Sequence, residues 1–317
     1  MSFLRTTAKL LAGIAFMCAA ATASRADDKP NVALLLFSRG FEFMVALDQG
    51  ARKEAEKLGI DLTVLDGQSN TEVQARQIED LLVRGVKAII ISPNNSNEIV
   101  PSVRKANDAG VPVVALDAIV GEGGKVVTHV GFDNAEGGKV AAEFLAKSGG
   151  ITEVLELQGA LGAYHAQKRG EGFAEGAKGF KVISRGAEWL AENAQSMTAD
   201  VLTANPNVTA IFSHNDEMVR GILAGLRQIG RDGKAGEANH IVIVGIDGTP
   251  LALDRIRKGE QDATVNQDPF EMGALAVRSV AAALKGETVP AQQLLPPTLV
   301  TKANVDDPSL WGNRFKP

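Results

Sequence analysis

The sequence predicts an α/β protein made of two similar lobes, each a doubly wound parallel sheet, joined by a hinge of several strands. Short apolar runs typical of buried parallel strands, such as NVALLLF at 31–37, alternate with segments of helical periodicity. This alternation indicates parallel sheets built by right-handed crossovers. It occurs in two series, and a chain of 317 residues is too long for one comfortable core.

The first series starts with the strand at 31–37 and a helix whose apolar residues, among them Met44, Leu47 and Ala51, recur at helical spacing up to Gly59. Strands are then expected at 60–66, 87–92 and 111–117, with helices at 71–85 and 96–110 between them. The second series has strands expected at 151–159, 180–184, 208–213 and 240–247, with helices near 164–178, 194–204 and 216–229. The repeated cycle predicts two lobes of the same design.

The chain is expected to pass between the lobes several times. It divides near 131–133, a helix from Pro269 to Lys285 returns to the first lobe, and PPTLVT at 296–301 crosses back. We therefore predict one lobe from 27–131 plus 268–296 and another from 132–267 plus 297–317. Lobes jointed in this way can close over a ligand between them.

The N-terminal segment 1–26 has the features of a secretory signal peptide. Basic residues precede an apolar stretch at 10–23, and small residues flank a cleavage point after Ala26. A membrane anchor is the alternative, but that stretch is shorter than the roughly 20 residues a spanning helix needs. Cys18 would leave with the signal, so the mature chain is predicted to be periplasmic and free of cysteine.

Composition and motifs argue against several functions. A net charge of −5 does not suit a nucleic-acid surface, which needs a basic face. The sequence contains no G-x-S-x-G, H-E-x-x-H, Walker lysine loop or cysteine pair, so no catalytic centre, metal site or cofactor is predicted. The four histidines are scattered, and only His165 and His214 lie beside predicted cleft residues.

Four predicted strands end in bare polar residues, namely Asp117, Asn215, Asp247 and Gln267. Ligands of open α/β sheets bind beyond the carboxyl ends of the strands, so these side chains are expected to converge. Each has a structural alternative: Asn215 could cap a helix, Asp247 could make a turn and Asp117 could be a solvated loop residue. Two carboxylates and two amides without a nucleophile suit the recognition of hydroxyl groups.

Aromatic residues are few, and three of them are candidate ligand contacts. Phe41 and Phe43 follow the first strand in what is expected to be an exposed loop, and Trp189 lies in the polar segment AEWLAEN. An aromatic ring can pack against the C–H face of a sugar while carboxylates accept its hydroxyl hydrogens. The alternative for Phe43 is a core contact beside Met44.

From about Asn31 to Lys302 the sequence resembles the ribose-type periplasmic binding proteins of ABC importers. The resemblance rests on DQGARKEAEKLG, DLLVRGVKAIIISP, VPVVALD, KRGEGF, HNDEM, VGIDGTP and ATVNQDP. It implies the type I periplasmic binding protein fold, and a monomer that captures a sugar and delivers it to a membrane permease. By this resemblance the sugar contacts are Phe43, Asp117, Asn215, Asp247 and Gln267, with Trp189 where the family has an aromatic residue.

The sequence departs from the family's ribose binders at four positions. Phe41 stands where they have Asn, Met44 where they have Phe, and Ala118 and Gln167 where they have Arg. Losing both guanidinium groups removes rigid bidentate donors and leaves Arg39 as the only expected positive charge in the cleft. We therefore expect a neutral sugar or an acyclic sugar alcohol, with an amino sugar as second choice and anions repelled.

Three other functions share features with this sequence. A regulator of the lactose-repressor type would carry a DNA-binding module where the signal peptide stands. A sugar-modifying periplasmic enzyme could use two Asp as an acid/base pair, but no metal, electrophile or nucleophile is recognisable beside them. A sugar-sensing partner of a chemoreceptor remains compatible with the same binding site.

Overall fold

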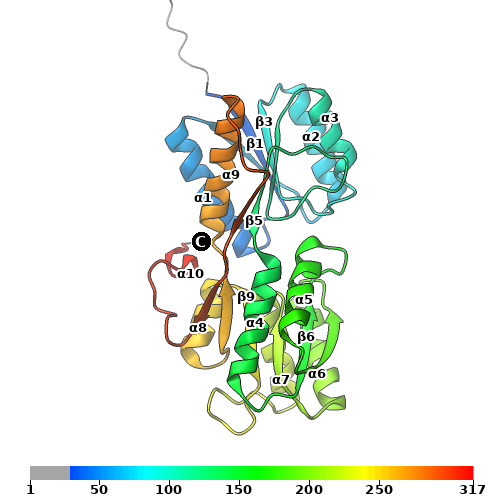
Figure 1. The fold of residues 1–317 in the computed structure, drawn as a ribbon, viewed down its shortest axis with the longest axis vertical. Helices are drawn as coiled ribbons and strands as arrows, with labels where there is room; N and C mark the ends of the chain where they lie inside the picture. Colours follow the sequence, from blue (N-terminus) through cyan, green and yellow to red (C-terminus); the bar gives the residue numbers. More distant parts are fainter. Residues whose placement is uncertain (1–28, 317) are drawn as a thin grey trace, which may run out of the picture.

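In the computed structural model, residues 29–316 form two α/β lobes stacked end to end, with the chain passing repeatedly through the waist between them (Figure 1). The predicted signal peptide, 1–26, lies outside the described residues. None of the helices within 29–316 is long and apolar enough to cross a membrane.

The first lobe is built on a sheet in the order β2–β1–β3–β4–β5–β11, in which every pairing is parallel. Its strands are β1 (Asn31–Leu36), β2 (Asp61–Asp66), β3 (Ala88–Ile91), β4 (Val113–Leu116), β5 (His129–Phe132) and β11 (Gln292–Leu295). Its helices are α1 (Glu42–Leu58), α2 (Thr71–Val83), α3 (Val100–Asp108) and α9 (Pro269–Leu284).

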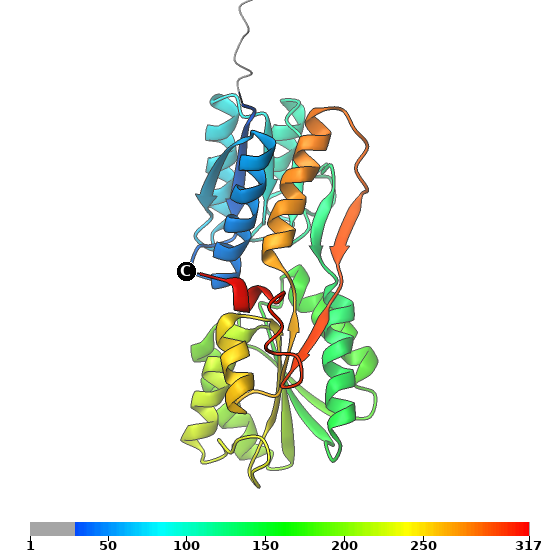
Figure 2. The same cartoon turned by 90° about the vertical axis from the view of Figure 1, so that its left-hand side faces the viewer.

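Both faces of this sheet are buried, as its continuous apolar strands predict. Along β1, Leu34 packs in the cluster that includes residues of α1 and α9, whereas Leu35 packs in the cluster that includes residues of α2 and α3. Successive side chains of a strand point to opposite faces, so one apolar run serves two cores. Figure 2 shows α1 and α9, which are far apart in sequence, side by side on one face.

The second lobe repeats this design with a sheet in the order β7–β6–β8–β9–β10–β12. Its strands are β6 (Glu153–Gln158), β7 (Lys181–Gly186), β8 (Val208–Ser213), β9 (Val242–Asp247), β10 (Ala263–Asn266) and β12 (Thr298–Thr301). Its helices are α4 (Asn134–Ser148), α5 (Tyr164–Gly176), α6 (Ala191–Ala204), α7 (Asp216–Gln228) and α8 (Pro250–Lys258), and a short helix, α10 (Trp311–Arg314), follows β12. The predicted fold class is thus confirmed.

The two sheets differ from each other in the direction of their last edge strand. The chain passes from one lobe to the other between β5 and α4, between β10 and α9, and between β11 and β12. Because β11 and β12 follow one another without a crossover helix, β12 pairs antiparallel with β10 while β11 stays parallel to β5. The sequence did not indicate β11, whose segment QQLL lacks a buried apolar run.

Helices α4 and α5 approach closely in the second lobe because glycines line their contact. A Cβ on Gly172 would lie 1.8 Å from the carbonyl oxygen of Ala135, and one on Gly138 would lie 2.0 Å from that of Arg169. Backbone atoms cannot yield as flexible side chains do. The space between α4 and α5 therefore requires glycine, which also sets the position of α5 at the waist.

We expect Gly172→Ala to destabilise the protein by about 1–3 kcal/mol, since overpacking forces the helices apart. The measurement is the urea unfolding midpoint of the ligand-free protein. Gly179→Ala is the matched control, because no atom lies within 4 Å of its Cβ position. Equal midpoints for the two variants would contradict the close approach of α4 and α5.

Candidate ligand-binding site

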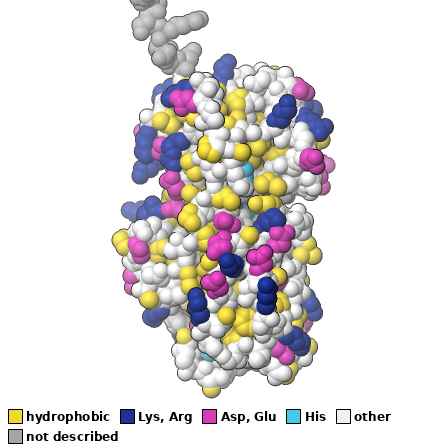
Figure 3. All heavy atoms as spheres, in the orientation of Figure 1, with side chains coloured by type: hydrophobic (Ala, Val, Ile, Leu, Met, Phe, Trp, Pro, Cys, Tyr) yellow, Lys and Arg dark blue, Asp and Glu magenta, His cyan; other side chains and the backbone are white. Residues whose placement is uncertain are grey.

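A cavity lies at the waist, where the carboxyl ends of the strands of both sheets face one another. Seen from outside, the lobes meet there at a narrowing, and acidic and basic side chains are mixed on the face of the second lobe below it (Figure 3). Eight of the ten predicted contact residues line the cavity: Phe41, Phe43, Met44, Asp117, Trp189, Asn215, Asp247 and Gln267. Arg39 and Gln167 lie outside this lining.

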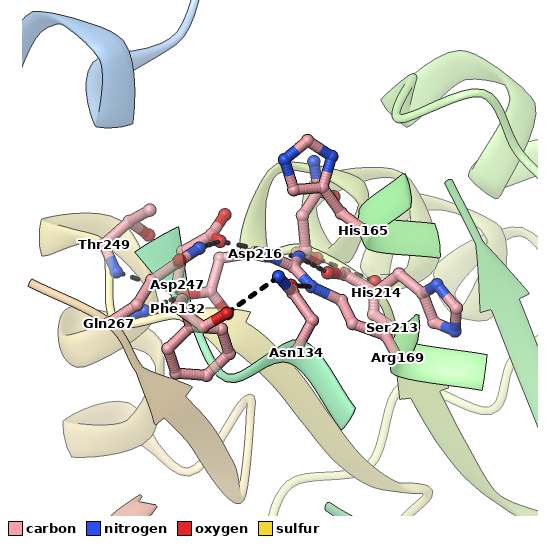
Figure 4. Close-up of polar contacts among 12 residues, drawn as sticks. Phe132, Asn134, His165, Arg169, Ser213, His214, Asp216, Asp247, Thr249 and Gln267 are labelled. Carbon is pink, nitrogen blue, oxygen red and sulfur yellow. Dashed lines mark hydrogen bonds and ion pairs between the residues drawn. The ribbon is translucent and has the colours of Figure 1, made fainter. Parts of the chain in front are cut away.

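The second lobe supplies amide and carboxylate groups from three strand ends. Asn215 follows β8 and caps α7, where its side chain accepts the N–H of Met218 at 3.0 Å, so capping and facing the cavity coexist in one residue. Asp247 is the last residue of β9, and Gln267 follows β10. The Gln267 amide donates to Asp247 Oδ1 at 2.6 Å (Figure 4). The strand ends therefore converge as the sequence predicted.

The turn after β9 holds Asp247 in a strained backbone conformation, with φ of 133°. The buried carboxylate of Asp216 holds this turn by accepting the backbone N–H of Gly248 at 2.8 Å and that of Thr249 at 3.1 Å. The hydroxyl of Thr264 also donates to Asp216, at 2.9 Å. Asp216 does not line the cavity, and its role is to hold the turn that carries Asp247.

Asp117 contributes the carboxylate of the first lobe. It follows β4 with φ of 65°, and its Oδ2 lies 3.2 Å from Nε2 of His165, which belongs to α5 of the second lobe. Burial raises the pKa of Asp117, but His165 and Arg169 outweigh burial and hold this pKa below its ordinary value. Asp117 is thus favoured as a carboxylate, and its contact with His165 joins the lobes across the cavity.

Arg169 is the main site residue that sequence reasoning missed. It is almost fully buried on α5, its Nε donates to Asn134 Oδ1 at 2.8 Å, and its Nη1 donates to the His214 carbonyl and lies 3.8 Å from Asp247 Oδ1 (Figure 4). The expectation of a cleft with Arg39 as its only positive charge is therefore wrong. Arg169 stands four residues after His165, a spacing that puts both on one helix face, and this was the available signal.

The structure also explains why Arg39 and Gln167 lie away from the cavity. The Arg39 guanidinium pairs with Asp48 at 2.8 Å and remains partly exposed. The Gln167 amide donates to the carbonyl of Leu161 at 3.2 Å in an exposed position. Both side chains therefore find an ion-pair or hydrogen-bond partner nearby, outside the cavity.

The aromatic side of the cavity is more rigid than the sequence suggested. Phe43 does not lie in an exposed loop: it is the second residue of α1, and it is buried against Trp311 while still lining the cavity. Phe43 thus packs in the core, as the alternative interpretation predicted, and its contact with a ligand stays a prediction. Tyr164 also lines the cavity and was not predicted.

Trp189 is held over the cavity by its backbone and by a glycine. It has φ of 65°, and a Cβ on Gly159 would lie 2.1 Å from its indole ring, so only glycine leaves room for the ring. The Arg169 guanidinium lies 5.7 Å from the centroid of this ring. The ring is therefore fixed by its surroundings before any ligand binds.

The charges of the cavity suit uncharged hydrogen-bonding ligands. Burial raises the pKa of Asp247 to about 7, against the opposing effect of Arg169. Asp117 and Asp247 can accept hydroxyl hydrogens, while Asn215 and Gln267 can donate to ligand oxygens. Within residues 29–316, no group of three or more His, Cys, Asp or Glu is placed to hold a metal ion.

Two lobes with polar strand ends and aromatic rings around a shared cavity define a hinged solute-binding protein. The sequence model of the periplasmic binding protein domain matches residues 32–288, and the chain belongs to this family. The chain is 37% identical to the ribose import binding protein RbsB of Escherichia coli K12, over 94% of this chain and 99% of that protein. It is also 37% identical to RbsB of Bacillus subtilis, over 78% and 79%.

Solved structures of proteins with a bound sugar or polyol share this fold. A periplasmic solute binding protein from Actinobacillus succinogenes with bound D-allose has a TM-score of 0.81 and 30% identity, covering 88% of this chain and all of that chain. The myo-inositol binding protein of Caulobacter, bound to myo-inositol, has a TM-score of 0.81 and 27% identity, covering 90% and 97%.

We expect Arg169→Leu to lower the free energy of unfolding by about 3–5 kcal/mol at about pH 8, because it removes the partner of the buried Asp247 carboxylate and the donor to Asn134 Oδ1 and the His214 carbonyl. Urea unfolding of the ligand-free protein measures this change. Arg220→Leu is the control, since its pair with Glu217 is exposed and such pairs contribute about 0–1 kcal/mol. Similar losses in the two variants would show that Arg169 is not electrostatically central.

The raised pKa of Asp247 predicts a pH-dependent stability. A carboxyl group whose folded pKa exceeds its unfolded value stabilises the fold at low pH, and this contribution is lost as pH rises through about 7. Asp247→Asn should therefore raise the melting temperature of the ligand-free protein more at about pH 8 than at about pH 5. A difference that does not vary with pH would mean that Asp247 titrates near its ordinary value.

Proposed function

We propose that the protein is the periplasmic solute-binding component of an ABC importer, which captures a neutral sugar or sugar alcohol between its lobes and delivers it to the membrane permease. The observation that carries this proposal is the cavity itself. Two buried carboxylates and two amides from four strand ends face aromatic rings across the waist. That arrangement provides hydrogen-bonding groups for hydroxyls and flat surfaces for C–H faces.

In this proposal each predicted contact that lines the cavity has a role. Asp117 and Asp247 accept hydroxyl hydrogens from opposite lobes, and Asn215 and Gln267 donate to ligand oxygens. The rings of Phe43 and Trp189 sandwich the ligand, with Phe41 and Met44 completing the apolar wall. We assign no contact to Arg39 or Gln167, because neither side chain lines the cavity.

Arg169 modifies the argument for a neutral ligand without reversing it. Its guanidinium is already engaged by Asn134, the His214 carbonyl and Asp247, so it compensates buried charge within the protein. An anion would still meet the Asp117 carboxylate in a cavity where charges are poorly screened. The ligands bound in the two similar structures, D-allose and myo-inositol, are uncharged, which supports the same class of ligand here.

The proposed transport cycle depends on movement between the lobes. We propose that 27–131 with 268–296, and 132–267 with 297–317, move as two bodies about the three crossings and close on the ligand. The closed monomer then presents both lobes to the permease. In this proposal the chain is secreted after cleavage at Ala26, binds no nucleic acid and catalyses no reaction.

The test is a thermal-shift screen of the mature protein followed by calorimetry, because a ligand that binds only the native state raises the melting temperature. The panel pairs D-ribose, D-allose, myo-inositol and D-glucitol with D-gluconate and D-ribose 5-phosphate. Stabilisation should be confined to the neutral members. Tight binding of an acid or phosphate would overturn the assignment of ligand class.

Asp247→Asn should weaken binding of the tightest neutral ligand by about 2–5 kcal/mol, since a buried charged partner is lost. Asp254→Asn is the matched control: Asp254 lies on α8, pairs with Lys258 and is partly exposed. Its affinity should match that of the wild type. Unchanged affinity in Asp247→Asn would show that Asp247 shapes the turn and does not bind the ligand.

A further inference from the structure

The segment after β12, residues 302–316 and here called the tail, rises beside α8 of the second lobe to the waist and contacts both lobes (Figure 2). On the second lobe, Arg257 of α8 pairs with Asp306 at 2.7 Å and donates to Asn313 Oδ1 at 2.7 Å. On the first, the Gln49 amide donates to the carbonyl of Lys316 at 3.0 Å. The family match ends at residue 288, before the tail begins.

Trp311 of the tail lies directly behind two walls of the cavity. It is fully buried, and its Nε1 donates to the backbone carbonyl of Asp247 at 2.7 Å. Its ring meets that of Phe43 edge to face, with centroids 6.3 Å apart. Asp247 and Phe43 come from different lobes and both line the cavity, so one side chain outside the cavity lining contacts a carboxylate-bearing residue and an aromatic wall.

The contact of the tail with the turn after β9 is close. A Cβ on Gly312 would lie 2.6 Å from the carbonyl oxygen of Gly248, so the backbone of the tail rests on this turn. The Asp247 carbonyl also accepts the N–H of Gln267 at 3.2 Å. Trp311 thus completes the hydrogen bonding of a peptide group whose residue has the strained φ of 133°.

A buried tryptophan usually finds a partner for its N–H, so a purely structural role is the competing explanation. That role predicts that loosening Trp311 matters only through global stability. A positioning role also predicts a local change in the cavity, because the strained turn would relax and redirect the Asp247 carboxylate. The two explanations therefore differ in a measurable way.

We propose that Trp311 is a positioning residue of the cavity, which orients Asp247 through its carbonyl and Phe43 through its ring from behind. The affinity part of this inference rests on the proposed function, while its structural part does not. Trp311 is accordingly a component of the site, although it does not line the cavity.

The experiment compares Trp311→Phe, which keeps an aromatic ring and removes the N–H, with Leu310→Val. Leu310 packs on Leu253 and Ile256 of α8 in a cluster that contains no cavity residue, so it controls for loss of stability. The first measurement is hydrogen exchange of the ligand-free proteins under conditions of equal global stability. Exchange at Gly248 and Gln267 should be at least about tenfold faster in Trp311→Phe than in Leu310→Val.

The second measurement is calorimetry with D-ribose, D-allose and myo-inositol as probes. Affinity for the tightest of the three should fall about tenfold or more in Trp311→Phe and stay within about twofold of the wild type in Leu310→Val, since a lost buried hydrogen bond is worth about that factor. If Trp311→Phe fails to fold, both measurements are made on Gly312→Ala instead. It keeps the indole while pushing the tail off the turn, and the same changes are expected.

Equal exchange in the folded variant and the control would overturn the positioning role. So would an altered exchange with unchanged affinity for a probe that the wild type binds. If the wild type binds none of the three probes while exchange at the turn changes as expected, the proposed ligand class fails and the positioning of Asp247 stands.

Discussion

The rest of the cavity depends on the contacts of one buried group, the guanidinium of Arg169. Parallel strands bring Asp247, the His214 carbonyl and other polar groups to one edge of the second sheet, where little water screens them. Such a concentration of acceptors is unfavourable without a fixed donor. Arg169 is that donor, because its planar group reaches the ends of two strands and Asn134 at once.

The same contacts connect the cavity with the joint between the lobes. Asn134, which accepts from Arg169, donates in turn to the carbonyl of Phe132, and these two residues flank the first crossing of the chain. Asp117 and His165 meet across the cavity from opposite lobes. The electrostatics that would select a ligand are therefore also the electrostatics that hold the lobes together, and a change of charge in the cavity acts on both.

Three residues that line the cavity have a strained backbone conformation. Asp117, Trp189 and Asp247 all have positive φ, although none is glycine, and each is held by its surroundings. Asp216 secures the turn of Asp247 with backbone hydrogen bonds, and Gly159 leaves the space into which the Trp189 ring fits. A site prepared in this way has little ordering left to do when a ligand binds.

The sequence alone determined the fold class and most of the cavity, for one geometric reason. Parallel strands that alternate with helices align their carboxyl ends, so the polar residues at those ends, such as Asp117 and Asn215, had to converge. Tertiary structure alone decided that Gln167 lies outside the cavity, that Phe43 packs against Trp311 while lining the cavity, and that Trp311 supports Asp247. These outcomes depend on how α5 rotates against α4 and on how the tail crosses between lobes. Both are set by contacts between residues distant in sequence, which no local pattern encodes.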